Sequence, residues 1–144
     1  MTDKSKELNS KITLLNNKLH FNGSVGENHP VSIDYIAPLG DDLGYTSLEL
    51  LLLSLSSCLG SAMLTFLRRM NRNITGFEIS SKGIRREEHP TGFSSINLEI
   101  SITTPDATED EVRKVINLAE DKYCPVWAML KGNTAVETKF SISR

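Results

Sequence analysis

The sequence is poor in features that would point directly to one chemistry. Its 144 residues include two cysteines, three histidines and one tryptophan, and the formal net charge is −2. Two cysteines cannot form a four-thiolate zinc site, and without a C-x-x-C pair the local dithiol motif is absent. The nearly balanced charge disfavours a nucleic-acid-binding protein with a dedicated basic face.

Catalytic motifs that are recognised by their spacing are also missing. The chain contains no G-x-S-x-G nucleophile elbow, no G-x-G-x-x-G and no other phosphate-binding loop. His20, His29 and His89 show no metal-ligand spacing, and the last two precede proline in predicted turns. We therefore expect neither a metal site nor a bound cofactor.

Hydrophobic runs long enough for a membrane are absent too. The richest apolar stretch, residues 48–59, is interrupted by serines and is shorter than the roughly 18–20 residues that span a bilayer. The lysines near the start have no apolar segment behind them, so residues 1–10 do not resemble a secretory signal. We expect a cytoplasmic protein without membrane contact, with one domain over residues 1–144 and a flexible N-terminus at 1–10. Because the cytoplasm is reducing, a disulfide in this protein would be transient and catalytic.

The spacing of apolar residues predicts an α+β fold. Asn16-Asn17 predicts a hairpin, Asn22-Gly23 predicts a second turn, and Gly83 predicts a bulge in a later strand. Most connections are typical of hairpins, so we expect antiparallel sheets with segregated helices. The predicted order is strand-strand-strand-helix-strand-strand-helix-helix-strand, with strands near 12–14, 18–21, 31–35, 77–84, 96–102 and 136–142.

The first two helices begin at capping boxes, in which a threonine and a glutamate satisfy each other's backbone amides. These are Thr46 with Glu49, and Thr108 with Glu111. The first helix is apolar in nearly every direction, which is typical of a helix buried in a core or an interface. One small domain would struggle to cover it, so we expect an obligate homodimer. The last turns of this helix carry cations that complement its dipole, Arg68, Arg69 and Arg72.

Three side chains are candidates for chemistry. Cys58 lies within the first helix, where the simpler interpretation is a small buried apolar residue. Cys124 precedes Pro125 at a predicted helix boundary, where unsatisfied amides can acidify a thiol, although a cysteine that only ends a helix fits equally well. Glu49 completes a capping box and needs no further role. Sequence spacing does not show whether the two cysteines come within disulfide reach.

Three segments together carry a family resemblance. They are D-Y-I-A-P-L-G at 34–40, T-S-L-E-L-L-L-L-S-L-S-S-C at 46–58, and Y-C-P-V at 123–126, which is followed by L-K-G at 130–132. Over nearly its whole length the chain resembles the OsmC/Ohr family, the osmotically inducible and organic hydroperoxide resistance proteins.

The resemblance implies a fold and a reaction. Proteins of this family are intertwined homodimers, with antiparallel sheets from both chains around central helices and two sites at the dimer interface. Cys58 would be the peroxidatic thiolate that attacks the O–O bond. Cys124 would resolve the sulfenic acid into a disulfide, which a dithiol reductant reopens. Glu49 would match a glutamate of the wider family, and the leucine-rich surroundings favour apolar organic hydroperoxides as substrates.

The sequence departs from the peroxidase branches of this family at the residues that activate the thiol. Those branches have an arginine in the N-terminal strands, whereas this chain has none before Arg68, and Leu48 occupies the position of their glutamate. A partner chain could supply the missing cation, and the candidates are Lys18, His20, Arg68, Arg69, Arg85 and Arg86. The departure favours a second hypothesis, a non-catalytic module that binds an apolar small molecule or senses redox state.

Overall fold

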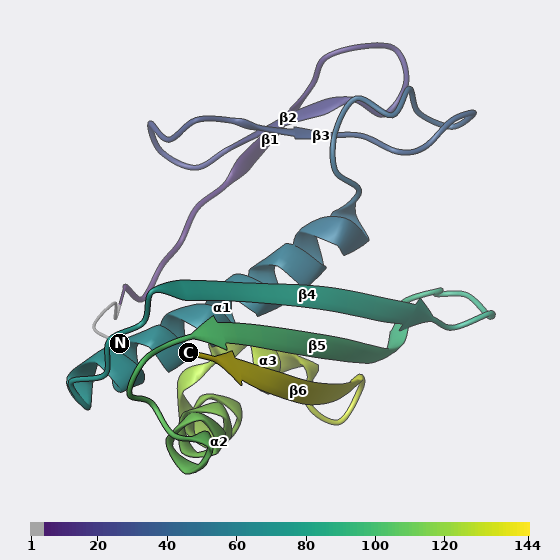
Figure 1. Cartoon of the computed structure of the whole chain (residues 1–144). Coiled ribbons are helices and arrows are strands. Elements are labelled where there is room, and N and C mark those ends of the chain that lie inside the picture. The colour runs from purple at the N-terminus through teal and green to yellow at the C-terminus, as the bar shows by residue number, and fades with distance from the viewer. Residues whose placement is uncertain (1–4) are drawn as a thin grey trace. The chain divides into compact units, whose positions relative to one another are not determined.

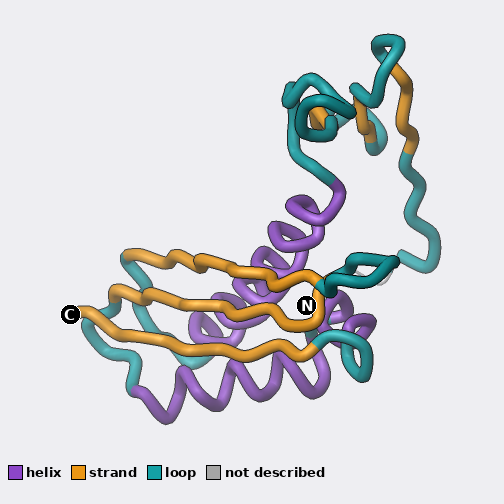
Figure 2. The backbone as a smooth tube through the Cα atoms, turned by 90° about the vertical axis from the view of Figure 1, so that its right-hand side faces the viewer, coloured by secondary structure: helices purple, strands orange, loops and turns teal. Residues whose placement is uncertain are grey.

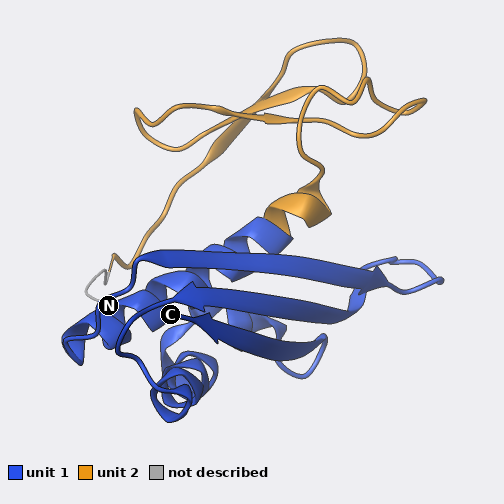
Figure 3. Ribbon diagram, in the orientation of Figure 1, with its two compact units in different colours: residues 1, 52–144 blue, residues 2–51 orange. Residues whose placement is uncertain are grey.

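The structure is a computed structural model that describes residues 5–144. The chain divides into two compact units, residues 2–51 and residues 52–144 (Figure 3). Of the N-terminus that was predicted to be flexible, residues 1–4 lie outside the described residues, and residues 5–10 form no strand or helix.

The N-terminal unit contains a three-stranded antiparallel sheet of β1 (Lys11–Leu14), β2 (Phe21–Ser24) and β3 (Val31–Ile33), in that order (Figure 1). The predicted hairpin is confirmed, because Asn16 Oδ1 accepts the backbone N–H groups of Lys18 and His20 and turns the chain between β1 and β2. The turn predicted at residues 22–23 is wrong. Both residues lie inside β2 because they pair with strands on either side.

The helix α1 (Ser47–Arg69) begins at the predicted capping box. The backbone N–H of Thr46 donates to Glu49 Oε1 at 2.8 Å, and the N–H of Glu49 donates to Thr46 Oγ1 at 3.3 Å. The expectation that no apolar run is long enough for a membrane is wrong by length and composition, because the 23 residues of α1 meet both criteria; core helices of soluble proteins also meet them. Leu53 is 51% exposed. The side chains of α1 with no exposed surface are Leu55, Leu59, Ala62, Met63 and Leu67.

The C-terminal unit contains a sheet of β4 (Gly76–Arg85), β5 (Phe93–Thr103) and β6 (Ala135–Ser143), side by side in that order (Figures 1 and 2). β4 and β5 pair antiparallel, whereas β5 and β6 pair parallel. The expectation of purely antiparallel sheets is therefore wrong for β6. Two helices return the chain along the sheet before β6 begins, and a parallel neighbour requires such a crossover.

Alternate residues of the central strand β5 form the core of this unit. Glu99 and Ser101 are exposed, so the predicted strand with one buried face is confirmed. The buried residues between and around them are at most 1% exposed: Ile96, Leu98, Ile100 and Ile102.

The bulge expected at Gly83 is displaced along β4. The register shifts between Ile84 and Arg85 instead. Gly83 serves close packing, because a Cβ atom at this position would lie 2.2 Å from Phe93 Cε1. The glycine therefore makes room for a ring of the neighbouring strand.

Two helices and one wider turn connect β5 to β6: α2 (Glu109–Leu118), the π-helical turn η1 (Ala119–Tyr123) and α3 (Pro125–Leu130). The second capping box is confirmed at Thr108 and Glu111. Arg72 lies beyond the end of α1, where its guanidinium forms an ion pair with Glu111 at 2.8 Å. This ion pair joins the end of α1 to the start of α2.

Candidate functional site

The structure brings the two cysteines together. Cys58 lies in the middle of α1, and Cys124 lies between η1 and α3, so both belong to the C-terminal unit. Both are free thiols, and the Cys58 side chain lies near enough to Cys124 to help raise the pKa of the Cys124 thiol. The fold therefore brings the two thiols, 66 positions apart in the sequence, into interaction range of each other.

The Cys124 thiol is buried and keeps its proton. It is 1% exposed, and its Sγ accepts a hydrogen bond from the backbone N–H of Trp127 at 3.4 Å. Burial, and next the hydrogen bond with Cys58, raise the pKa of Cys124 well above its ordinary value, against the opposing effect of the Trp127 N–H. Of the two interpretations that the sequence left open for Cys124, acidification by helix amides is not supported, because burial outweighs the amides of the six-residue α3.

Cys58 is the accessible member of the pair. It is partly exposed and lies between a fully buried residue, Leu59, and an exposed one, Ser57. A molecule in solvent can thus reach Cys58, whereas Cys124 is screened from solvent. This asymmetry distinguishes the two thiols chemically.

Glu49 acts in the structure as a helix cap. Its carboxylate accepts the N–H of Thr46, and it precedes Cys58 by nine residues, which corresponds to about two and a half helical turns. The capping interpretation is confirmed. A role for Glu49 in the chemistry remains a prediction.

Most of the cations that were proposed to replace the missing arginine are already engaged. Lys18 forms an ion pair with Asp41 at 2.7 Å, and Arg69 lies over the ring of Phe66 at 5.5 Å. Arg85 and Arg86 donate hydrogen bonds to Thr91 and to the backbone carbonyls of Thr91, Phe93 and Asn133. Arg68, in the last turn of α1, is exposed.

The histidines do not form a metal site within the described residues. Among residues 5–144, no three His, Cys, Asp or Glu side chains are grouped as metal ligands would be. His20 instead places Nε2 2.8 Å from Ser32 Oγ, within the N-terminal sheet.

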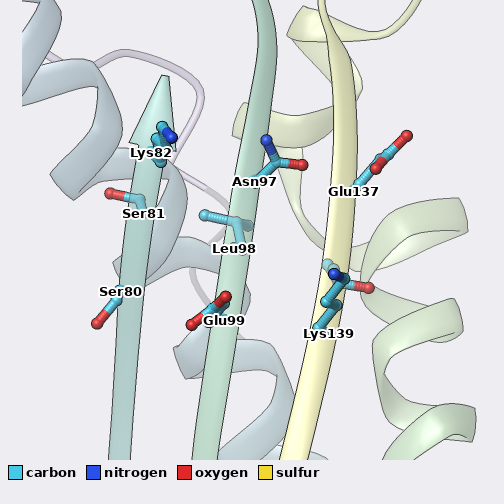
Figure 4. Close-up of a pocket in the computed structure, with 9 residues that line it drawn as sticks. Ser80, Ser81, Lys82, Asn97, Leu98, Glu99, Glu137 and Lys139 are labelled. Atoms are coloured by element: carbon cyan, nitrogen blue, oxygen red, sulfur yellow. The ribbon is translucent and has the colours of Figure 1, made fainter. Parts of the chain in front are cut away.

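Two hollows of the C-terminal unit contain no cysteine in their lining. One, of about 450 Å³, lies on the outer face of the sheet among Lys82, Asn97, Glu137 and their neighbours (Figure 4). Its charged side chains belong to the water-facing side of a half-buried sheet, so we interpret it as a solvated face. The other, of about 380 Å³, lies between α1 and β4 and is largely apolar, with Leu53 and Phe77 in its walls.

The sequence did not reveal an aromatic contact between α1 and the residue before Cys124. The ring of Tyr123, the residue before Cys124, packs on the ring of Phe66 in α1 with 4.8 Å between centroids. The two residues are far apart in the chain, and a tertiary ring contact has no periodic signature. The Tyr-Cys-Pro order was visible, but nothing in it indicated a partner on α1.

Comparisons with known proteins identify the family and the fold. A family model described as OsmC-like protein matches residues 40–139. The Escherichia coli K12 protein YhfA is 26% identical over 113 residues, which cover 78% of this chain and 82% of YhfA. A hypothetical protein from Aquifex aeolicus VF5 aligns with a TM-score of 0.84 at 23% identity, covering 96% of this chain and 98% of that one. The organic hydroperoxide resistance protein OhrB of Bacillus subtilis aligns with a TM-score of 0.64 at 19% identity, covering 92% and 98%. At such identities the structural matches establish the fold.

Proposed function

This chain belongs to the OsmC-like protein family, and from that premise we propose that it is a thiol-dependent peroxidase that reduces organic hydroperoxides. The observation that carries the proposal is the pair of interacting free thiols, Cys58 and Cys124, of which one is partly exposed and the other is buried. The fold shared with an organic hydroperoxide resistance protein supports the class of substrate.

The proposed reaction has two steps on the protein. The Cys58 thiolate attacks one oxygen of the hydroperoxide, so that an S–O bond forms, the O–O bond breaks and the alkoxide leaves as an alcohol after protonation. The sulfur of Cys124 then attacks the sulfenic sulfur of Cys58, and the hydroxyl leaves as water. The proton that burial retains on Cys124 is available to this leaving hydroxyl.

A dithiol reductant completes the cycle. It gives up two electrons and two protons, becomes a disulfide itself and restores both protein thiols. We propose that it attacks the partly exposed Cys58 sulfur, since Cys124 is 1% exposed. Such a cycle fits a cytoplasmic location, where a reducing pool regenerates thiols.

We assign Glu49 a positioning role in addition to its cap, in which its carboxylate orients a cation toward the thiolate of Cys58. Glutamine can also complete a capping box. Glu49→Gln should therefore keep the melting temperature of the wild type and lower the rate of peroxide consumption. An unchanged rate would leave Glu49 with the cap alone.

We propose a homodimer as the working form. In residues 5–51 no hydrophobic side chain is buried, and a small sheet without a covered apolar side is not stable by itself. Light scattering at micromolar concentration should give twice the chain mass of 16.0 kDa. A monomer would contradict this proposal. Exposed apolar residues of this unit, each 51–64% exposed, include Ile12, Leu14, Leu15, Ile36 and Leu39.

A non-catalytic binding module remains a second candidate function. The observation that favours it is the largely apolar hollow between α1 and β4, where Leu64 and Ile79 also line the wall. Native mass spectrometry of protein purified from cells should then show a bound hydrophobic molecule. Peroxide turnover by the wild type with no such molecule would argue against it.

The main experiment compares peroxide consumption by wild type, Cys58→Ser and Cys124→Ser. With cumene hydroperoxide and a lipoyl-type dithiol between pH 6 and 8, the wild type should turn over and Cys58→Ser should be inert. Cys124→Ser should stop after about two equivalents of hydroperoxide, one that forms the Cys58 sulfenic acid and one that oxidises it to the sulfinic acid detected by mass, because no protein thiol resolves the sulfenic acid. If wild type and Cys58→Ser are equally inert, the peroxidase proposal fails.

Alkylation tests the different reactivity of the two thiols. Because burial raises the pKa of Cys124, its reactive thiolate fraction is lowered at every pH below that pKa. Iodoacetamide at pH 8 should label Cys58 at least about tenfold faster than Cys124 in the native protein. In urea the two rates should become similar. Equal native rates would contradict the assigned roles.

A further inference from the structure

The backbone that leads into Cys124 departs from regular helix geometry. In η1 the N–H of Cys124 bonds to the carbonyl of Ala119, five residues back, at 2.9 Å. Such wide turns are rare and often lie at functional sites. The middle of the turn is loosely held, since Asp121 and Lys122 are exposed and the ion pair between Asp121 and Lys131 is 3.8 Å long.

The ends of η1 are held much more firmly than its middle. At the start, Ala119 is fully buried. At the end, the Tyr123 ring packs on Phe66 with 4.8 Å between centroids and an interplanar angle of 56°. Cations lie over both rings, since Arg69 is 5.5 Å from the Phe66 centroid and Lys122 is 5.6 Å from the Tyr123 centroid.

The same two segments, α1 and the end of η1, therefore touch at two points. Cys58 and Phe66 are eight residues apart on α1, which corresponds to about 12 Å along the helix axis, and their partners Cys124 and Tyr123 are consecutive residues. A thiol contact alone would allow the segment to pivot about it. A second contact removes that freedom and holds the sulfur of Cys124 against Cys58.

We propose that Tyr123, through its ring contact with Phe66, is a positioning residue that holds the Cys124 thiol beside Cys58 and so raises the tendency of the pair to form a disulfide. The inference deepens the proposed function, on which it rests for its biological meaning. The contact acts through the ring and not through the hydroxyl, because the ring is what meets Phe66. Tyr123 itself does not touch the reacting atoms in this role.

The redox potential of the pair measures this role directly. In a glutathione buffer, Cys58 and Cys124 lose two protons and two electrons to one oxidised glutathione, which gives the intramolecular disulfide and two reduced glutathiones. A residue that only stabilises the fold supports the reduced and the oxidised protein equally and leaves this equilibrium unchanged. A residue that positions the thiols changes it.

The experiment compares Tyr123→Leu with Tyr123→Phe in the full-length protein, with thiol labelling across glutathione ratios. Tyr123→Leu should lower the equilibrium constant for disulfide formation about tenfold, which equals about 30 mV for a two-electron couple. Tyr123→Phe, which keeps the ring, should stay within about twofold of the wild type. Phe66→Leu tests the same contact from α1 and should lower the equilibrium constant by the same factor. It replaces Tyr123→Leu in the comparison if that variant fails to fold.

Phe140→Leu is the matched control. Phe140 is another partly buried ring beneath a cation, Arg113, at 5.5 Å, but it lies on β6. Its replacement should leave the potential of the thiol pair unchanged. The proposal is overturned if Tyr123→Leu and Phe66→Leu keep the wild-type potential, or if Tyr123→Phe is as impaired as Tyr123→Leu.

The outcomes for this inference and for the proposed function can be told apart. Wild type that forms the disulfide in glutathione but consumes no peroxide would remove the peroxidase function and leave the positioning role standing. If the wild type turns over peroxide while Tyr123→Leu keeps the wild-type redox potential of the thiol pair, the peroxidase function stands and the positioning role of Tyr123 is overturned. A wild type that never forms the disulfide would overturn both.

Discussion

The N-terminal unit and the C-terminal unit of this chain differ in what lies inside them. Every buried hydrophobic side chain of the described residues belongs to residues 52–144. In residues 5–51 the buried residues are Asp34 and Gly40. The C-terminal unit thus has a core of its own, in which the thiol pair lies, whereas the N-terminal unit is organised by hydrogen bonds around one carboxylate. The difference teaches that one chain can join a unit with an apolar core to a unit whose described residues bury no hydrophobic side chain.

The carboxylate of Asp34 is the centre of the N-terminal unit. It accepts backbone N–H groups from Tyr35 at 2.7 Å, Leu43 at 3.1 Å and Asp41 at 3.2 Å, and so closes the loop after β3. Gly44 allows the chain to return close to β3, because a Cβ atom there would lie 2.2 Å from Ser32 O. Hydrogen bonds thus hold the N-terminal unit in its fold, whereas apolar packing holds the C-terminal unit.

The largest expected effect is the loss of stability when a buried side chain of the C-terminal unit is shortened, compared with the same change in the N-terminal unit. Ile100→Ala, in the buried face of β5, should cost about 2–5 kcal/mol of unfolding free energy because it leaves a cavity. Ile12→Ala, at a position 60% exposed, should cost less than about 0.5 kcal/mol in the isolated chain. Urea unfolding measures both. Equal losses in a protein shown to be monomeric would abolish the distinction between the units.

The next effect concerns pH and the N-terminal unit. Burial raises the pKa of Asp34, but the three N–H donors together lower it below its ordinary value of 3.8. Because the folded pKa lies below the unfolded one, the carboxylate stabilises the fold fully above the unfolded pKa. This contribution is lost as the pH falls through the folded pKa.

Wild type should accordingly lose stability more steeply than Asp34→Asn as the pH falls from about 5 to 2. At pH 7, Asp34→Asn should melt at a lower temperature than wild type, since an amide offers one oxygen to three donors. Circular dichroism across this pH range measures the slopes. Glu27→Gln, at an exposed position, is the control and should follow the wild type. Parallel curves for Asp34→Asn and wild type would show that Asp34 is not the centre of the unit.

The smallest expected effect compares the two capping boxes, one in each unit. Thr108→Ala removes a cap that is tied to Arg72 through Glu111 and should cost about 1 kcal/mol. Thr46→Ala removes the cap of α1 in the exposed N-terminal unit and should cost about 0.5 kcal/mol. Thermal melts of the two variants decide the order. A larger loss at Thr46 would mean that the N-terminal unit carries more of the stability than its burial suggests.

Local features of the fold could be predicted well from the sequence. Both capping boxes, the alternation in β5 and the break at Cys124-Pro125 are present as expected, because each depends on residues a few positions apart. Predictions that needed a neighbouring strand were weaker. Residues 22–23 were expected to form a turn, but they lie inside β2 and pair with its neighbouring strands. The bulge expected at Gly83 lies at Ile84 and Arg85.

The candidate site divides in the same way. Cys58, Cys124 and Glu49 could be singled out by residue type and position, and the cap of Glu49 followed from the three-residue spacing. The raised pKa of Cys124 could not be foreseen, since it depends on burial and on a thiol 66 positions away. The ring contact of Tyr123 with Phe66 was equally hidden.

The sequence alone determined the order of elements, the starts of α1 and α2 and the presence of two thiols in contrasting settings, because these depend on short-range spacing and on the backbone limits of proline and capping residues. Only the tertiary structure decided that β6 runs parallel to β5, that the two thiols come into interaction range, and that burial raises the pKa of Cys124. The physical reason is that desolvation, ring packing and strand direction arise between segments distant in the chain. Their effects exist only after those segments have come together.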